Sequence, residues 1–269
     1  LYADPSRIPD PYVALAAHRL ARGSTTAVIV TTRSPSIAPE TEDLVRAIRA
    51  YDPGGGLHLM VDGSAGAAVD IVAALYQQFP RALLLIIGLT YVSLFLLFRS
   101  VILPLKAILM DALSLFASYG ALVVIFQQGF LANLLGFEPL GFVEATLPII
   151  MFCMLFGLSM DYEVFLLSRI QEAYRRSGDN TASVTEGLAR SGQVITSAAM
   201  IVVIVSLCFV SADIVLIKAL GLGAAIAVFL DATIVRALLV PALMRLLGDW
   251  NWWMPRFLRV GLPRSVVLR

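Results

Sequence analysis

Two aspartates interrupt long apolar runs and therefore need a chemical reason to be there. Asp161 lies in the run Phe-Gly-Leu-Ser-Met-Asp-Tyr-Glu-Val-Phe, and Asp231 lies in the run Leu-Asp-Ala-Thr-Ile-Val-Arg. An ionisable side chain at the centre of a membrane span costs at least ~2.5–3.5 kcal/mol, and such residues often mark proton or ion pathways. A carboxylate that has lost its water favours the neutral form, so it can bind and release a proton near neutral pH.

The two aspartates are predicted to lie at the same depth. Asp161 follows Pro148 by 13 residues, and Asp231 follows Lys218 by 13 residues. At the rise of an α-helix this spacing covers roughly 20 Å from the outer boundary. Because both helices are expected to run inward, we expect both carboxylates in one polar site, slightly to the cytoplasmic side of the midplane.

The neighbours of these aspartates suggest partners on other helices. The Tyr162 phenol can hydrogen-bond to a carboxylate, but adjacent helical residues point about 100° apart, so its partner must lie on a facing helix. Arg236 follows Asp231 by five residues, which is off the i,i+4 spacing that pairs side chains along one face. We therefore expect Arg236 to reach another helix or to extend to the inner surface.

Other polar residues in the apolar runs are weaker candidates. Asp111 lies about one and a half turns beyond Lys106, near the inner interface where charge is tolerated, and we expect an ordinary role for it and for Glu163. Small residues on the fourth span indicate close helix packing, and Thr196 and Ser197 either serve that packing alone or join a proton path. Glu163, Thr196 and Ser197 are kept as supporting residues of the site.

The composition indicates what must position these side chains. Of the 269 residues, 59% are hydrophobic and 14% are charged, and the mean hydropathy is +0.84. Soluble domains carry about 25% charged residues, so the apolar runs are expected to cross a bilayer as helices, which satisfy their own backbone. We predict a mainly α fold, a polytopic bundle with five transmembrane spans: Ala82–Phe98, Ala107–Phe126, Ala145–Ser168, Val194–Val210 and Ala219–Leu239.

The Lys and Arg residues indicate the orientation of this bundle. If the loop with Arg99 and Lys106 is cytoplasmic, most other arginines beyond it are cytoplasmic too, and the two short outer loops keep only Lys218. Positive residues gather on the cytoplasmic side of membranes. We therefore predict a multi-pass membrane protein with an extracytoplasmic unit (residues 1–79), a transmembrane domain (80–247) and a cytoplasmic tail (248–269).

Residues 1–79 have the composition of a soluble unit. The expected order is strand, helix, strand and helix, over Thr25–Thr32, Ala38–Ala50, Leu57–Val61 and Ser64–Phe79. This order predicts a small α/β unit.

The connecting segments carry weaker signals. Thr181–Ser191 is either an amphipathic helix at the membrane surface or a solvated connector. The run Trp-Asn-Trp-Trp from Trp250 is expected to anchor the last span at the interface. The chain starts with Leu1 and no signal segment follows, which suggests that it begins within a longer protein.

Several classes of function are not supported by the sequence. It contains no metal-ligand spacing, nucleophile elbow or phosphate-binding loop, and its net charge is only +1. Cys153 and Cys208 read as small hydrophobic residues. We therefore expect no enzyme activity, no cofactor, no metal and no nucleic-acid partner.

Four segments resemble the mycobacterial membrane protein large (MMPL) family. The residues that carry the resemblance are Phe98–Ala107, Phe156–Leu167, Leu230–Arg236 with Leu239–Leu243, and Gly248–Pro255. The resemblance covers nearly all of the chain from about Val61, and its Met-Asp-Tyr-Glu run is specific. It implies an exporter of lipids or drugs in the bacterial inner membrane, from the resistance-nodulation-division superfamily, which has twelve spans in two pseudo-repeats and two extracytoplasmic porter domains. This chain would hold the end of the second porter domain and the eighth to twelfth spans.

The resemblance also implies roles for the candidate residues. In the family, Asp-Tyr pairs of the fourth and tenth spans relay protons together, and Asp161 and Tyr162 match the tenth-span pair. Asp231 and Arg236 match the twelfth-span residues that support the relay. The first seven spans are absent here, so a missing N-terminal half or a second copy of the chain would supply the partner helices.

Two classes of function remain open at this point. The first is a secondary active transporter that uses protons to export lipids or other amphiphiles, with membrane lipids around it. The alternative is a non-transporting scaffold or assembly partner, or an inactive fragment, in which the ionisable residues only pack.

Overall fold

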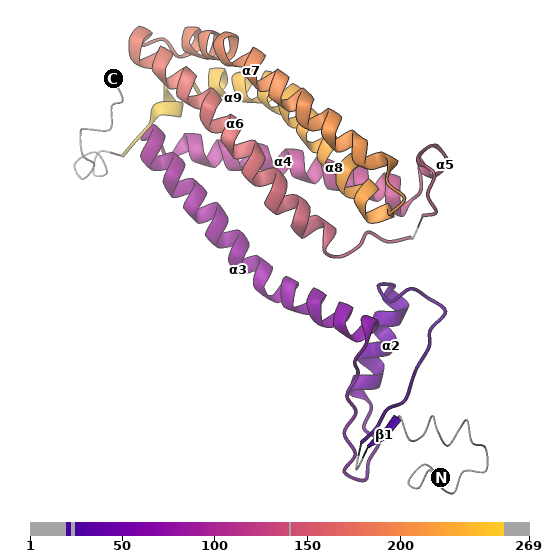
Figure 1. Ribbon diagram of the computed structural model, residues 1–269. Coiled ribbons are helices and arrows are strands. Elements are labelled where there is room, and N and C mark those ends of the chain that lie inside the picture. Colours follow the sequence, from indigo (N-terminus) through magenta and orange to yellow (C-terminus); the bar gives the residue numbers. More distant parts are fainter. Residues whose placement is uncertain (1–19, 23–24, 140, 256–269) are drawn as a thin grey trace, which may run out of the picture. The chain divides into compact units, whose positions relative to one another are not determined.

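The protein is mainly helical over the residues that the computed structural model describes, which are 20–22, 25–139 and 141–255 (Figure 1). Two compact units divide the chain, Leu1–Ile71 and Val72–Arg269. The long helices are α2 (Pro39–Ala50), α3 (Ser64–Phe98), α4 (Ile102–Leu122), α6 (Leu147–Ser177), α7 (Asn180–Cys208), α8 (Val215–Leu230) and α9 (Val240–Leu247). The shorter elements are β1 (Ala21–Arg22), β2 (Thr25–Thr26), α5 (Ala132–Leu135), the π-helices η2 (Val123–Gln127) and η4 (Asp231–Leu239), and the 3₁₀-helices η3 (Phe209–Ser211) and η5 (Gly248–Trp252).

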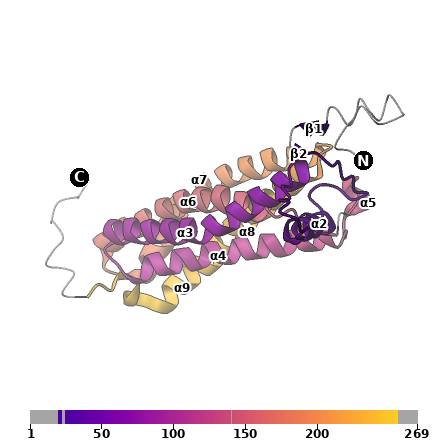
Figure 2. The ribbon, with the colours of Figure 1, turned by 90° about the horizontal axis from the view of Figure 1, so that it is seen from below.

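Among the described residues, five helical stretches are long and apolar enough to cross a membrane, which confirms the predicted polytopic bundle. Each is longer than the span expected from hydropathy alone. They are Ser64–Phe98, Ile102–Gln127, Leu147–Ser177, Asn180–Ser211 and Val215–Trp252. In both views of the ribbon, α4, α6, α7 and α8 run side by side (Figures 1 and 2). Their facing side chains form the core.

The unit Leu1–Ile71 differs from the predicted strand-helix order. Only Thr25–Thr26 of the first expected strand pairs, with Ala21–Arg22, and the expected strand Leu57–Val61 is irregular. Val28 and Met60 are 81% and 87% exposed, so neither segment has a buried face against which a strand could pack. Helix α2 does form as expected, with a proline in its first turn and Glu40 and Glu42 beside its N-terminus.

The first span differs from its prediction at its start. A helix Ser64–Phe79 and a separate span from Ala82 were expected, but α3 continues without a break through Pro80. Proline removes one backbone hydrogen bond, which a long apolar helix tolerates. The boundary predicted at residue 79 therefore falls inside a helix, whereas the two compact units divide after Ile71.

A tight turn joins α6 to α7 and makes these helices antiparallel neighbours. Gly178 ends α6 with φ of 69°, a left-handed conformation that glycine adopts without strain. Asp179 then caps α7, because its side chain accepts a hydrogen bond from the Ala182 backbone N–H. The segment Thr181–Ser191 is consequently the first part of α7, continuous with the span that follows.

The C-terminal end of the described chain contacts several helices through hydrogen bonds and ring stacking. Asn251 is buried, and its backbone oxygen accepts a hydrogen bond of 2.5 Å from the Ser100 hydroxyl ahead of α4. Trp252 stacks on Tyr174 of α6 and donates to the Asn180 side chain of α7. The tryptophan run therefore serves helix packing at Trp252, while Trp250 is 68% exposed.

Helices α6 and α7 approach each other closely at Gly187. A β-carbon at this position would lie 2.9 Å from both the backbone N and the Cα of Ile170, which are closer than real contacts allow. Small residues permit such close approach of membrane helices. Gly192, one and a half turns further along α7, has open space at the same atom.

This contact predicts different effects for two alanine substitutions on one helix. Gly187→Ala is expected to lower the free energy of unfolding by ~1–3 kcal/mol, because the helix backbones must move apart. Gly192→Ala is the matched control, and it should be neutral or stabilising by ~0.5–1 kcal/mol, because alanine favours the helix. Detergent-induced unfolding followed by circular dichroism measures both. Equal stability of the two variants would contradict the close contact.

Candidate functional site

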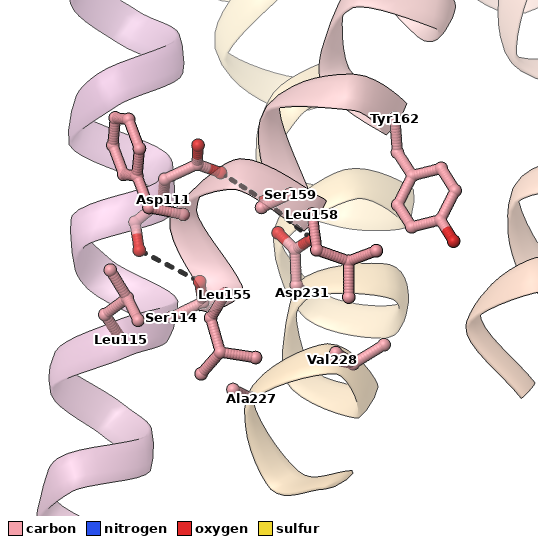
Figure 3. A pocket seen from close by; sticks show the side chains of 11 residues that line it. Asp111, Ser114, Leu115, Leu155, Leu158, Ser159, Tyr162, Ala227, Val228 and Asp231 are labelled. Atoms are coloured by element: carbon pink, nitrogen blue, oxygen red, sulfur yellow. Dashed lines mark hydrogen bonds between the residues drawn. The ribbon is translucent and has the colours of Figure 1, made fainter. Parts of the chain in front are cut away.

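Four polar side chains meet in the interior of the larger unit. Asp111 of α4, Ser159 of α6, and Asp231 and Arg236 of η4 are all buried, and the Arg236 residue is only 2% exposed. The Ser159 hydroxyl lies 2.5 Å from Asp111 Oδ1 and 2.9 Å from Asp231 Oδ2. Figure 3 shows the two aspartates reaching Ser159 from different helices. We call these four residues the buried cluster.

Arg236 is the cation of the buried cluster. Its Nη2 lies 2.6 Å from Asp231 Oδ2 and donates to both the Ser159 hydroxyl, at 2.7 Å, and the Ser159 backbone oxygen, at 2.5 Å. The guanidinium carbon also lies 5.2 Å from the centre of the Tyr162 ring, a cation–π distance. One arginine therefore holds α6 and the last helix together through charge and hydrogen bonds.

Arg236 reaches another helix, as one of the two expectations had it, because it donates to Ser159 of α6. It also pairs with Asp231, which its spacing of five residues was not expected to allow. In an α-helix, residues five apart point about 140° away from each other. The segment Asp231–Leu239 is instead a π-helix, in which hydrogen bonds span five residues, as the bond from Val240 N–H to the Val235 oxygen shows. This wider turn brings Asp231 and Arg236 onto one face.

A correction concerns the position of Asp111, which was expected near the inner interface. It is 2% exposed and accepts a hydrogen bond from Ser159. The expectation assumed that Lys106 lies at the surface, but Lys106 is itself only 5% exposed. Ser159 was missed altogether. Its signal is positional, because it lies at helical spacing from the buried Leu155 and Glu163 on the inner face of α6.

The structure brings Tyr162, but not Asp161, to the buried cluster. Tyr162 is half-buried beside Asp231, and Figure 3 shows its ring on the side away from Asp111. Asp161 is exposed on the outer face of α6, because one helical step turns it away from Tyr162. The predicted common site of Asp161 and Asp231 is therefore not formed by the described residues. Instead, Asp231 and Tyr162 line one cavity together.

Of the three supporting residues, Thr196 and Ser197 lie apart from the buried cluster. Thr196 and Ser197 are exposed on α7, and the Thr196 hydroxyl donates to the Gly192 oxygen within its own helix at 2.8 Å. Glu163 is 2% exposed, and its Oε1, like Lys106 Nζ, is buried without a hydrogen-bond partner among the described residues. Glu163 thus adds buried charge close to the cluster, whereas Thr196 and Ser197 do not.

A small cavity connects the buried cluster to Tyr162. It is lined by Asp111, Ser159, Tyr162 and Asp231 together with apolar side chains of α4, α6 and α8 (Figure 3). The volume open to the centres of water molecules is about 20 Å³, and one water needs about 10–15 Å³. Asp111 Oδ2 and Asp231 Oδ1 are buried without partners among the described residues, so a water would find acceptors there.

The chemistry that this arrangement supports is proton binding. Two carboxylates and one guanidinium surround a hydroxyl, with room for a water that leads toward a half-buried phenol. Within the described residues, no group of three or more His, Cys, Asp or Glu side chains is placed to hold a metal ion.

Comparison with known proteins gives a consistent assignment. A model of the MMPL family matches residues 13–266. The trehalose monomycolate exporter MmpL3 of Mycobacterium tuberculosis is 41% identical over 214 residues, which are 79% of this chain and 22% of that protein. The mycolic acid-containing lipids exporter MmpL11 of Mycolicibacterium smegmatis is 39% identical over 226 residues, 84% of this chain and 24% of that protein.

The name of a third relative gives a different function. The heme uptake protein MmpL11 of Mycobacterium tuberculosis is 38% identical over 233 residues, which are 85% of this chain and 24% of that protein. The chain therefore spans only 22% to 24% of the length of these three relatives. With five apolar spans and a family match over nearly its whole length, the chain belongs to the MMPL family of membrane transport proteins.

Proposed function

We propose that this chain is part of a secondary active exporter that moves lipids or other amphiphiles out of the inner membrane and is driven by proton entry. The observation that carries the proposal is the buried cluster, in which two carboxylates and one arginine surround the Ser159 hydroxyl. Such groups are costly in a membrane and are typical of proton relays. The names of two relatives, a trehalose monomycolate exporter and an exporter of mycolic acid-containing lipids, support a lipid substrate.

In this proposal the relay runs through Asp161, Tyr162, Asp231 and Arg236. Arg236 and Tyr162 are in cation–π contact, so the phenol is held beside the Asp231–Arg236 pair. Asp161 faces outward from α6, where helices from outside this chain, supplied by a longer protein or by a second copy, would meet it. Glu163 supports the site through its buried charge, and Thr196 and Ser197 support it only if such added helices pack on α7.

The proposed orientation follows from the distribution of positive charge. The loop with Arg99 and the α6–α7 turn with Arg175 and Arg176 would face the cytoplasm, together with residues 248–269. Residues 1–79 would lie outside. Protons would then enter the relay from the extracytoplasmic side and leave it toward these loops.

The test measures proton movement and lipid movement in the same vesicles. The protein, as the cell makes it, is reconstituted into liposomes with a pH-sensitive dye inside and a fluorescent trehalose ester of a long-chain fatty acid in the membrane. A pH gradient is expected to drive both transfer of the ester and proton flux, and a protonophore should stop the transfer. Transfer at the same rate without a gradient would contradict the proton coupling.

The same experiment distinguishes the proton-coupled exporter from the scaffold alternative. Folded wild-type protein that moves neither protons nor the ester would favour a scaffold. The control is Asp231→Asn, which keeps the shape of the side chain and removes its charge. Loss of both fluxes in this variant is the expected result for a relay.

A further inference from the structure

The hydrogen bonds around Ser159 determine how many protons the buried cluster carries. Three groups lie within hydrogen-bond distance of its Oγ: Asp111 Oδ1, Asp231 Oδ2 and Arg236 Nη2, at 2.5, 2.9 and 2.7 Å. A serine hydroxyl has one proton to donate and two lone pairs to accept with. Arginine only donates, so it uses one lone pair. One proton and one lone pair then remain for two carboxyl groups.

Ser159 Oγ can hydrogen-bond to both carboxyl groups and to Arg236 only when one of the two carboxyl groups is protonated. Ser159 donates its proton to one aspartate, and the other aspartate must donate to Ser159, which requires a carboxylic acid. The charges agree with this result, because two carboxylates and one guanidinium give a net charge of −1, and one added proton makes the cluster neutral. A net charge buried away from water is strongly unfavourable.

The salt bridge indicates which aspartate holds the proton. Asp231 Oδ2 lies 2.6 Å from Arg236 Nη2, so Asp231 is the ionised partner. Among the described residues Asp111 forms no ion pair. Two other buried ionisable residues lie near it, Glu163 of α6 and Lys106 of α4, and neither forms an ion pair with the buried cluster among the described residues.

We propose that Asp111 and Asp231 share a single proton through Ser159, and that Asp111 is a proton-binding residue of the transporter. The transport part of this proposal rests on the proposed function. Asp111 is not among the residues to which the family resemblance assigns a role. It extends the relay from the last helix to α4.

The transfer within the buried cluster is balanced. The O–H bond of Asp111 breaks as a new O–H bond forms on Ser159 Oγ, while the original Ser159 O–H bond breaks and its proton binds Asp231 Oδ2. Ser159 ends as it began, Asp111 becomes a carboxylate and Asp231 becomes neutral. The Asp231–Arg236 pair then loses its charge attraction. A water in the cavity beside Asp111 can return a proton to the Asp111 carboxylate.

The experiment detects the shared proton directly by infrared spectroscopy. Purified protein in lipid nanodiscs at neutral pH is expected to show the C=O stretch of a protonated carboxylic acid, which shifts in D₂O. Asp111→Asn should remove this band, because the amide can donate to Ser159 in place of the acid and keeps the cluster neutral. Asp161→Asn, on the exposed face of the same bundle, is the matched control and should keep the band.

A second variant tests the bridge itself. Ser159→Ala should keep the band but move it to higher frequency, because the acid loses its hydrogen-bond partner. Circular dichroism and gel filtration confirm that each variant is folded. A band that survives in folded Asp111→Asn, or one that does not move in Ser159→Ala, would overturn the proposal.

The spectrum does not depend on transport, so the two proposals can fail separately. If the band disappears in Asp111→Asn but the wild type moves no protons, the proposal of a shared proton stands and the proposed export function is wrong. If the wild type couples protons to lipid transfer and the band is unchanged in Asp111→Asn, only the role of Asp111 is wrong.

Discussion

Arg236→Ala is expected to lower the free energy of unfolding by ~3–5 kcal/mol at neutral pH, because it leaves the Asp231 carboxylate buried without its cation. The Arg236 side chain is only 2% exposed, so bulk solvent does not screen the charge of Asp231 in place of the guanidinium. The variant also removes two hydrogen bonds to Ser159. Detergent-induced unfolding, followed by circular dichroism, measures the loss.

The double variant Asp231→Asn/Arg236→Gln is the control for this prediction. It removes both charges and keeps the approximate shape of both side chains, so it should be more stable than Arg236→Ala alone. If the double variant and Arg236→Ala lose the same stability, the cost comes from packing and the ion pair does not explain it.

Asp161→Asn is expected to reduce proton-coupled export by ~100-fold or more, the usual scale for loss of a group that transfers protons. In contrast to Arg236, Asp161 is exposed on α6, so its loss should change the free energy of unfolding by no more than ~0.5 kcal/mol. The variant therefore separates transport from stability. Export of a fluorescent lipid from proteoliposomes under a pH gradient measures the effect.

Glu172→Gln serves as the matched control for Asp161→Asn. Glu172 is also an exposed acid on α6, and its ion pair is with Arg169 on the same helix. Its loss should leave export near the wild-type rate. Export by well-folded Asp161→Asn at the same rate as Glu172→Gln would remove Asp161 from the relay.

Hydropathy predicted the five helices because a bilayer leaves an apolar chain little choice of structure. The same reasoning identified Asp231 as a buried charge, and the structure places it 6% exposed. The burial of Asp231 was therefore accessible from the sequence. The direction in which a side chain points was not, because each residue turns the helix by about 100° and a single uncertain step moves the side chain to another face.

The details of the site escaped sequence reasoning for a related reason. The i,i+4 rule that separated Asp231 from Arg236 holds for α-helices, and nothing in the sequence marks Asp231–Leu239 as a π-helix. Ser159 is a neutral residue in an apolar run, so its importance depends on contacts from α4 and the last helix. The strand expected at Thr25–Thr32 failed because strand propensity does not supply a neighbouring strand.

The π-helix also has a mechanical consequence. It lies between α8 and α9 in the last span, and the ion pair of Asp231 and Arg236 lies within this connecting segment. Beyond this segment, α9 is tethered at its end, where the Met244 oxygen accepts hydrogen bonds from Asn180 and Asn251. If a substitution removes either charge of this pair, the direction of α9 depends on these hydrogen bonds near the α6–α7 turn and on side-chain packing alone.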